Sequence, residues 1–192
     1  MSGQANVITG VRCYSKAMGF GGVGLKLHLG GSTVNMILRA YMDYGIVAED
    51  LVQLDMVNSF FLGDAYILLK SSQRKMISGV NIVNNMFSGS GKGVNIVQLD
   101  GQFQSINQIV IDRNNVLGMA LKSTVARGTV KSNGTTWTID FNPVLLFPNH
   151  IQHVQYSFYT SDASFPRHAL RNVSQNIVVI EADTQVSTIV AI

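Results

Sequence analysis

Hydrophobic and polar positions follow two different periods in the first third of the chain. Residues 25–29 alternate strictly, with leucines on one face and Lys26 and His28 on the other, which predicts a half-buried strand. From Val34 to Met42 the apolar residues recur three and four positions apart, as they do on one face of a helix. Residues 48–62 show a second stripe of this kind, with two carboxylates in its first turn. This segment therefore predicts two helices.

Beyond residue 65 the pattern changes to short apolar runs separated by turn residues. The triplet 132–134 contains Asn-Gly, which is typical of a hairpin turn. We find no internal repeat and no linker-like change in composition. The sequence predicts one globular domain, residues 1–192, of the strand-rich α+β class, in which the two early helices precede a mainly antiparallel sheet or β-sandwich. The strand candidates are 94–99, 105–112, 117–131, 135–141, 151–160 and 176–180.

Charge is scarce in this chain. Only 13% of the residues are charged, against about 25% in an ordinary soluble domain. A surface with so few charges repels its copies weakly, which predicts a homo-oligomer. The net charge of +3 lies wholly in residues 1–96, where Arg74, Lys75 and Lys92 form a candidate basic edge. Without a basic arm, this edge predicts only weak contact with an anionic membrane surface or RNA.

No stretch of the sequence carries a complete catalytic or ligand-binding motif. The glycines of residues 19–24 lead into a strand, whereas a dinucleotide-binding loop opens a helix. The loop at 88–93 lacks the hydroxyl residue that follows the lysine of a phosphate-binding loop. His150 and His153 precede a strand candidate and have no cysteine near them, and Cys13 is the sole cysteine. We predict no catalytic residues, no metal and no cofactor.

The sequence also bears on location. The first residues lack the charged start and apolar run of a signal peptide, and no apolar stretch is long enough to span a bilayer. Two triplets, 133–135 and 172–174, match the acceptor pattern for N-glycosylation. Without a secretion signal they are interpreted as chance matches in an Asn-rich chain. The prediction is an intracellular, cytoplasmic or virion-associated protein.

Three classes of function remain open. By composition and layout the chain resembles the small structural proteins of viruses, so the leading hypothesis is a non-enzymatic, self-assembling protein of the matrix or coat type. The alternative is a cytosolic lectin-like or other ligand-binding β-rich module, with Trp137, Tyr156, Phe158 and Tyr159 as its aromatic platform. The third is an enzyme of unrecognised type. Solution mass at several concentrations separates the first two classes.

The C-terminal residues form a further candidate site. Residues 186–192 are apolar to the last position, and Val190 and Ile192 have the spacing of a peptide that adds to a sheet as a strand. An exposed apolar strand would be an unpaired edge, which monomeric proteins avoid. We therefore expect this tail to pair with a sheet, either its own or that of a partner subunit.

Overall fold

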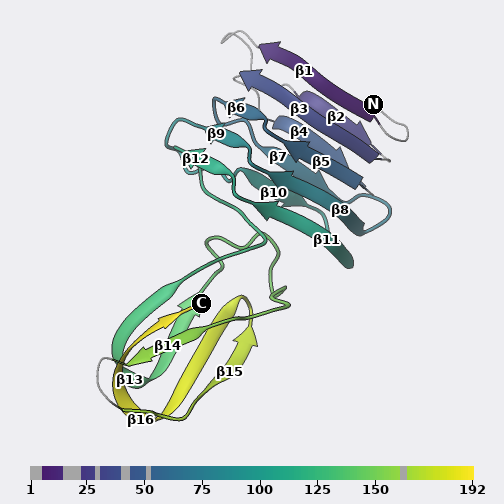
Figure 1. Ribbon diagram of the computed structural model, residues 1–192. Coiled ribbons are helices and arrows are strands. Elements are labelled where there is room, and N and C mark those ends of the chain that lie inside the picture. Colours follow the sequence, from purple (N-terminus) through teal and green to yellow (C-terminus); the bar gives the residue numbers. More distant parts are fainter. Residues whose placement is uncertain (1–5, 15–22, 29–30, 40–43, 51–52, 161–163) are drawn as a thin grey trace. The chain divides into compact units, whose positions relative to one another are not determined.

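The computed structural model describes residues 6–14, 23–28, 31–39, 44–50, 53–160 and 164–192. These residues contain sixteen strands and no helix (Figure 1). None of them therefore forms a helix that could cross a membrane. The chain divides into two compact units, Met1–Thr124 and Val125–Ile192, which are called unit 1 and unit 2 below.

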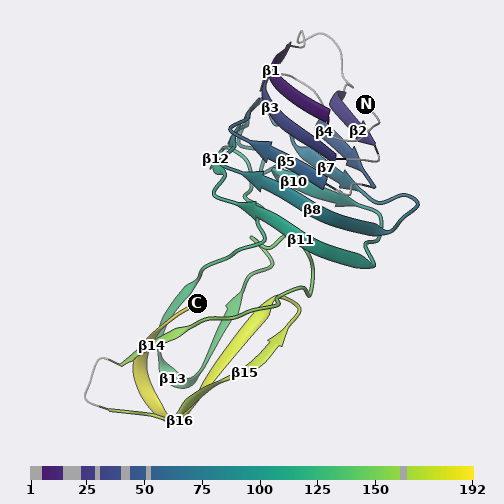
Figure 2. The ribbon, with the colours of Figure 1, turned by 45° about the vertical axis from the view of Figure 1, so that its right-hand side comes forward.

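Unit 1 is a coil of parallel strands. Its four-stranded sheet has the order β10-β7-β4-β2, and its eight-stranded sheet has the order β11-β8-β5-β3-β6-β9-β12, with β1 also paired to β3. The strands lie one above another in both ribbon views (Figures 1 and 2). This arrangement is a parallel β-helix, a solenoid in which each turn of the chain contacts its neighbours. Its strands are β1 (Asn6–Tyr14), β2 (Val23–His28), β3 (Gly31–Arg39), β4 (Tyr44–Glu49), β5 (Gln53–Val57), β6 (Phe60–Leu62), β7 (Ile67–Lys70), β8 (Met76–Val83), β9 (Met86–Ser88), β10 (Val97–Asp100), β11 (Ser105–Asp112) and β12 (Asn115–Leu117).

The parallel coil corrects the prediction of two early helices and an antiparallel sheet. Residues 34–39 of the first expected helix lie in β3, which pairs in parallel with β1, β5 and β6, and its last residues lie outside the described ones. The second expected helix spans the end of β4 and the whole of β5 and β6. Leu54 and Phe61 on its expected inner face are buried, but Asn58 between them is exposed and has a φ of 51°. Strands of five and three residues joined by such a bend give apolar spacings of two, three and four, which imitate a helical stripe.

Structurally equivalent positions recur along the sequence from one turn of the coil to the next, although no internal repeat was expected. Leu54, Val80 and Ile109 share one register position, so successive turns are 26 and 29 residues long. The same stacking places Phe61 over Phe87, with ring centroids 4.6 Å apart and planes within 6°. Equivalent positions in successive turns therefore bury the same kind of side chain and form one continuous core.

One bend of the coil is held by stacked amide groups. Asn58, Asn84 and Arg113 occupy equivalent positions and have φ values of 51°, 56° and 53°. The residue that follows each of them, Ser59, Asn85 or Asn114, takes part in a stack of hydrogen bonds. Ser59 N donates to Asn85 Oδ1 at 2.9 Å, and Asn85 N donates to Asn114 Oδ1 at 3.0 Å.

The amide nitrogens of this stack complete the network. Asn85 Nδ2 donates to the Met56 carbonyl at 3.1 Å, and Asn114 Nδ2 donates to the Ile82 carbonyl at 3.0 Å. Asn85 is only 1% exposed, so each of these bonds replaces water that the buried amide has lost. The asparagines therefore satisfy backbone groups that the bend withdraws from the sheets.

Unit 2 is an antiparallel sheet built around one long strand. Its strands are β13 (Thr129–Asp140), β14 (Ser157–Thr160), β15 (His168–Ser174) and β16 (Ile177–Ala191). β16 pairs with the other three. Trp137, Ile180, Val186 and Val190 form the core cluster. The hairpin expected at 132–134 is absent, because β13 runs through these residues and only shifts register between Gly134 and Thr136.

Candidate functional site

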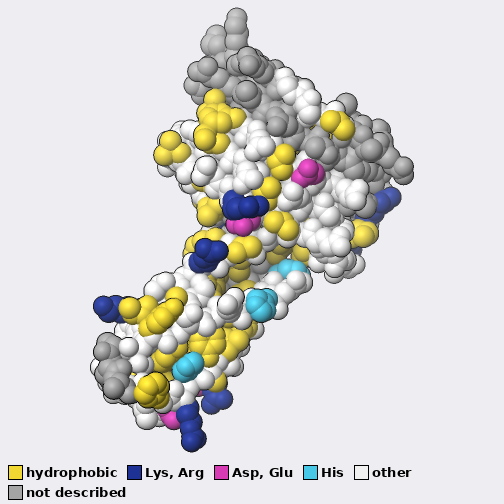
Figure 3. All heavy atoms as spheres, viewed as in Figure 1, with side chains coloured by type: hydrophobic (Ala, Val, Ile, Leu, Met, Phe, Trp, Pro, Cys, Tyr) yellow, Lys and Arg dark blue, Asp and Glu magenta, His cyan; other side chains and the backbone are white. Residues whose placement is uncertain are grey.

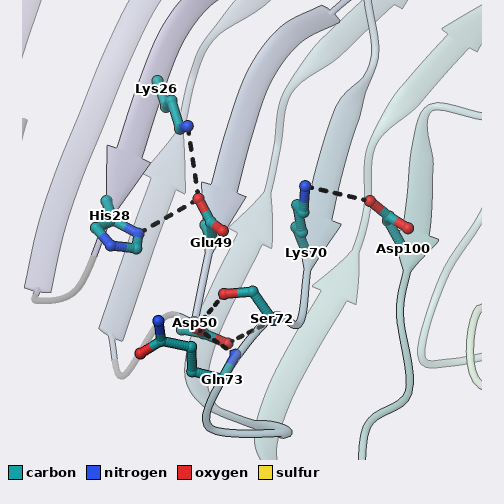
Figure 4. Close-up of polar contacts among 8 residues, drawn as sticks. All are labelled: Lys26, His28, Glu49, Asp50, Lys70, Ser72, Gln73 and Asp100. Atoms are coloured by element: carbon teal, nitrogen blue, oxygen red, sulfur yellow. Dashed lines mark hydrogen bonds and ion pairs between the residues drawn. The ribbon is translucent and has the colours of Figure 1, made fainter.

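A row of charged side chains crosses the outer face of the four-stranded sheet in unit 1 (Figure 4). Leu27, Ala48 and Leu69 are buried in the coil, so the residues beside them in each strand point outward. The register aligns His28 with Glu49, Glu49 with Lys70, and Lys70 with Asp100. We call these four residues, together with Lys26 of β2, the charged row.

Glu49 is the centre of one half of the charged row. Its Oε2 lies 3.6 Å from Lys26 Nζ and 3.4 Å from His28 Nδ1. The contact with His28 is an ion pair only when the imidazole is protonated, and among the described residues His28 Nδ1 has no hydrogen-bond partner. The Ser72 hydroxyl lowers the pKa of Glu49, and the charges of Lys26, His28 and Lys70 lower it further against the opposing effect of burial. Glu49 is therefore an ionised acceptor at neutral pH.

The cations of the charged row remain accessible to solvent. The Lys26 side chain is 62% exposed, whereas that of Glu49 is 15% exposed. The His28 side chain is 43% exposed, but its Nδ1 atom is buried. Lys70 Nζ lies 3.7 Å from Asp100 Oδ2, and both side chains are about half exposed, at 40% and 54%. Exposed ion pairs of this kind are weak, so an anionic ligand can compete for these cations.

A buried carboxylate holds the corner next to the charged row. Asp50 is 2% exposed and follows Glu49 at the end of β4. It accepts hydrogen bonds from Ser72 N at 2.9 Å, Ser72 Oγ at 2.6 Å and Gln73 N at 3.0 Å (Figure 4). Burial would raise the pKa of Asp50, but these hydrogen bonds, with one from the Arg74 backbone, lower it to about 2. This fixed anion anchors the turn that leads from β7 to β8.

The eight-stranded sheet carries a second polar pair on its outer face. Asn81 Nδ2 donates to Asp55 Oδ1 at 2.6 Å, and the two residues are register partners in β8 and β5. The bond ties neighbouring turns of the coil together. Among the residues that the structure describes, no group of three or more His, Cys, Asp and Glu side chains could hold a metal ion.

The structure separates the residues of the predicted basic edge. Arg74 and Lys75 are exposed together in the turn between β7 and β8, at the Asp50 corner. Lys92 is exposed in the loop between β9 and β10, at a different corner of the coil. Basic side chains are also scattered over the face drawn in Figure 3.

No sequence pattern predicted a function for the residues of the charged row. A signal for it exists, because Glu49, Lys70 and Asp100 each directly follow an apolar residue at the end of a strand, in the segments 46–50, 67–71 and 97–101. Aligning these three segments would have brought the charges together. These charged residues are far apart in the sequence, so no local motif contains more than one of them.

The structure places the predicted C-terminal tail in its own sheet. Val190 is fully buried and pairs with Val130 on one side and Phe158 on the other. Ile192 and Gly128 exchange two backbone hydrogen bonds, of 2.8 and 2.9 Å. Trp137, expected in an aromatic platform, is 1% exposed and packs in the core of unit 2.

Comparison with known proteins gives one informative match. No family model matches the chain, and no solved structure matches it. The chain is 60% identical over 192 residues to "Polygalacturonase QRT3" of Arabidopsis thaliana. That relative is an enzyme. The match covers 97% of this chain but only 40% of the relative's length.

This similarity overturns several predictions. A relative that is 60% identical across nearly the whole chain and is named a polygalacturonase contradicts the predictions of a non-enzymatic protein of the viral matrix or coat type and of an intracellular or virion-associated location. The low share of charged residues was a poor guide to the class of function, because a β-helix can also contain few charged residues. One bend of unit 1 is held by stacked, uncharged asparagine side chains. Homo-oligomer formation and weak contact with an anionic partner stay predictions.

Proposed function

We propose that this chain is part of an enzyme that hydrolyses polygalacturonate outside the cytoplasm, and that the charged row binds the carboxylates of that polysaccharide. The observation that carries the proposal is the 60% identity to a polygalacturonase over 97% of the chain. The charged row supplies the chemistry that such a substrate needs, because it presents accessible cations on a regular, solvent-facing sheet.

The spacing of the cations suits a repeating polyanion. Lys26 and His28 lie on β2, and Lys70 lies on β7, two strands away in the same sheet. Neighbouring strands are about 4.8 Å apart, so Lys26 and Lys70 are separated by roughly 10 Å across the strands and by a further two residues along them. A polysaccharide with one carboxylate on each sugar can therefore cross the strands and contact both groups. Glu49 and Asp100 hold the cations in place until the substrate carboxylates replace them.

We assign binding, and not bond cleavage, to the charged row. Hydrolysis of a glycosidic bond uses one carboxyl group that donates a proton and a second that acts as base or nucleophile. The lowered pKa of Glu49 is the opposite of what a proton donor needs, and a role as base or nucleophile is disfavoured because its side chain is only 15% exposed and pairs with Lys26. Glu49 is therefore a positioning residue that orients Lys26 and His28.

The test measures reducing ends released from polygalacturonate by the purified gene product that contains this chain. Lys26→Gln and Lys70→Gln are expected to raise KM about two- to fivefold each, as for the loss of an exposed ionic contact of roughly 0.5–1 kcal/mol. Arg171→Gln is the matched control, because Arg171 forms a 2.9 Å exposed pair with Glu181 in unit 2.

Each outcome bears on one part of the proposal. Release of reducing ends from polygalacturonate but not from a neutral glucan supports the substrate class. No release from polygalacturonate contradicts the proposed activity. Normal activity with unchanged KM in both lysine variants would keep the activity and remove the charged row from substrate binding.

A further inference from the structure

Two acceptor triplets for N-glycosylation lie in unit 2. The sequence contains two Asn-x-Ser/Thr triplets, Asn133-Gly134-Thr135 and Asn172-Val173-Ser174, and both fall within Val125–Ile192. Unit 1 is the longer unit and has none. The earlier interpretation as chance matches depended on an intracellular location, which the similarity to a polygalacturonase has overturned.

The two triplets lie on different edge strands of one sheet. In the described residues, β13 and β15 each pair with β16 alone. Asn133 lies in β13 and Asn172 lies in β15, and both side chains are exposed. An edge strand offers unpaired backbone groups to other chains, and proteins commonly protect such edges with bulges, charges or covering groups. The register of β13 shifts inside its triplet, and that of β15 shifts just before its triplet.

The surroundings of Asn133 leave room for a large attached group and give it a surface to cover. Asn133 is aligned with Ser187, so it faces the same side of the sheet as Ile189 two residues along β16. Ile189 is 37% exposed, and its register partner Tyr159 is 59% exposed. Exposed hydrophobic side chains are also visible on the face of unit 2 drawn in Figure 3.

Asn172 has a different but equally open setting. Its register partner Val179 and the next residue in that row, Thr138, lie on the outward side, while Val178 beside them is buried. Asn172 Nδ2 donates to Ser174 Oγ at 3.3 Å, so the described bond of this amide stays within its own triplet. Attaching a sugar to Nδ2 replaces this exposed bond and disturbs no core contact.

We propose that Asn133 and Asn172 carry N-linked oligosaccharides. In the transfer, Asn Nδ2 bonds to the anomeric carbon of a lipid diphosphate-linked oligosaccharide and loses one proton. The bond from that carbon to the diphosphate oxygen breaks, and the lipid diphosphate leaves. The inference rests on the extracellular location in the proposed function, because the chain must enter the secretory compartment to meet this donor. The two oligosaccharides shield both edges of the unit 2 sheet.

The experiment measures the intact mass of chain 1–192 expressed in plant cells behind a cleavable secretion signal. We expect two glycan increments that peptide N-glycosidase A removes. Asn133→Gln and Asn172→Gln should each remove one increment. Thr135→Ala and Ser174→Ala should remove the same increments while keeping the asparagine. A mass equal to that of the unmodified chain overturns the inference, as do increments that persist in the hydroxyl variants.

A matched control and a second source of protein distinguish failure of the glycosylation proposal from failure of the proposed extracellular location. Asn115→Gln changes an exposed asparagine outside any triplet and should leave both increments in place. The native protein from its own tissue is measured in parallel. Absence of glycans from the signal-directed chain overturns the inference and leaves the hydrolase proposal standing. Their absence from the native protein alone overturns the extracellular location on which the inference rests.

Discussion

Replacing Asp50 by asparagine should destabilise unit 1 in a way that depends on pH. The carboxylate accepts three hydrogen bonds from Ser72 and Gln73 and is 2% exposed. A fall in the pKa of Asp50 from 3.8 to about 2 corresponds to roughly 2 kcal/mol of stability. In Asp50→Asn the new amide hydrogens face hydrogen-bond donors. We therefore expect a loss of roughly 2–3 kcal/mol at neutral pH.

The sign of the pH dependence follows from the lowered pKa. Because the folded state holds the pKa of Asp50 below its value in the unfolded chain, the stabilisation is complete above about pH 4 and is lost as the pH falls toward 2. The difference between wild type and Asp50→Asn should thus shrink to less than half at about pH 2.5.

The assay is amide hydrogen exchange of residues 67–83, read by mass spectrometry at about pH 7 and about pH 2.5. Tryptophan fluorescence is unsuitable because the single tryptophan, Trp137, lies in unit 2. Asp64→Asn is the matched control. Asp64 binds Ser90 N and Ser90 Oγ at 2.7 and 2.5 Å, but in an exposed setting, so its loss should be smaller. Equal protection in Asp50→Asn and wild type at pH 7, or a difference independent of pH, would refute the reasoning.

Three further predictions concern the stability of unit 1, measured by the same exchange experiment. Phe87→Ala removes half of a buried aromatic stack and should cost about 3–5 kcal/mol; a cost under 1 kcal/mol would contradict the continuous core. Asn85→Ala should cost about 2–4 kcal/mol because it leaves buried backbone groups unpaired, whereas Asn115→Ala on the surface should change stability by less than about 0.5 kcal/mol. Gly101→Ala and Gly91→Ala both place alanine at a φ of 88°. Only at Gly101 does the new Cβ lie 2.3 Å from a backbone oxygen, that of Ser71, so Gly101→Ala should be the more destabilising.

Sequence patterns located many strands but not their partners. The run at 105–112 falls on β11, and residues 25–28 of the alternation at 25–29 fall on β2, so both predictions are confirmed for the described residues. Their pairing was wrong, because both strands belong to parallel sheets. Alternation reports which side of a strand is buried, and it carries no information about the direction of the neighbour.

The predicted helices failed for a local reason. In residues 48–62 the chain changes direction at Asp50 and again at Asn58, where φ is 47° and 51°. Each change resets which side chains point inward, so the apolar positions lose their period of two. Asparagine and aspartate tolerate this conformation better than other side chains, and that preference was a usable signal.

The candidate site could not be predicted from spacing within a motif. His28, Glu49, Lys70 and Asp100 come from four strands and meet only because the turns of the coil stack in register. Their sequence separations follow the lengths of the turns, which vary with the loops between strands. A search for catalytic motifs finds residues fixed by local geometry, whereas this row is fixed by the long-range register of a solenoid.

That stacking also limits where unit 1 can place charged side chains. In a parallel coil, each residue lies about 4.8 Å above its equivalent in the preceding turn, so a charge repeated at one position would repel itself along the whole stack. Two solutions are visible in unit 1. The bend at Asn85 and Asn114 uses uncharged amides that bond to one another, and the row from Glu49 through Lys70 to Asp100 alternates sign. Both arrangements avoid stacking like charges on neighbouring turns of unit 1.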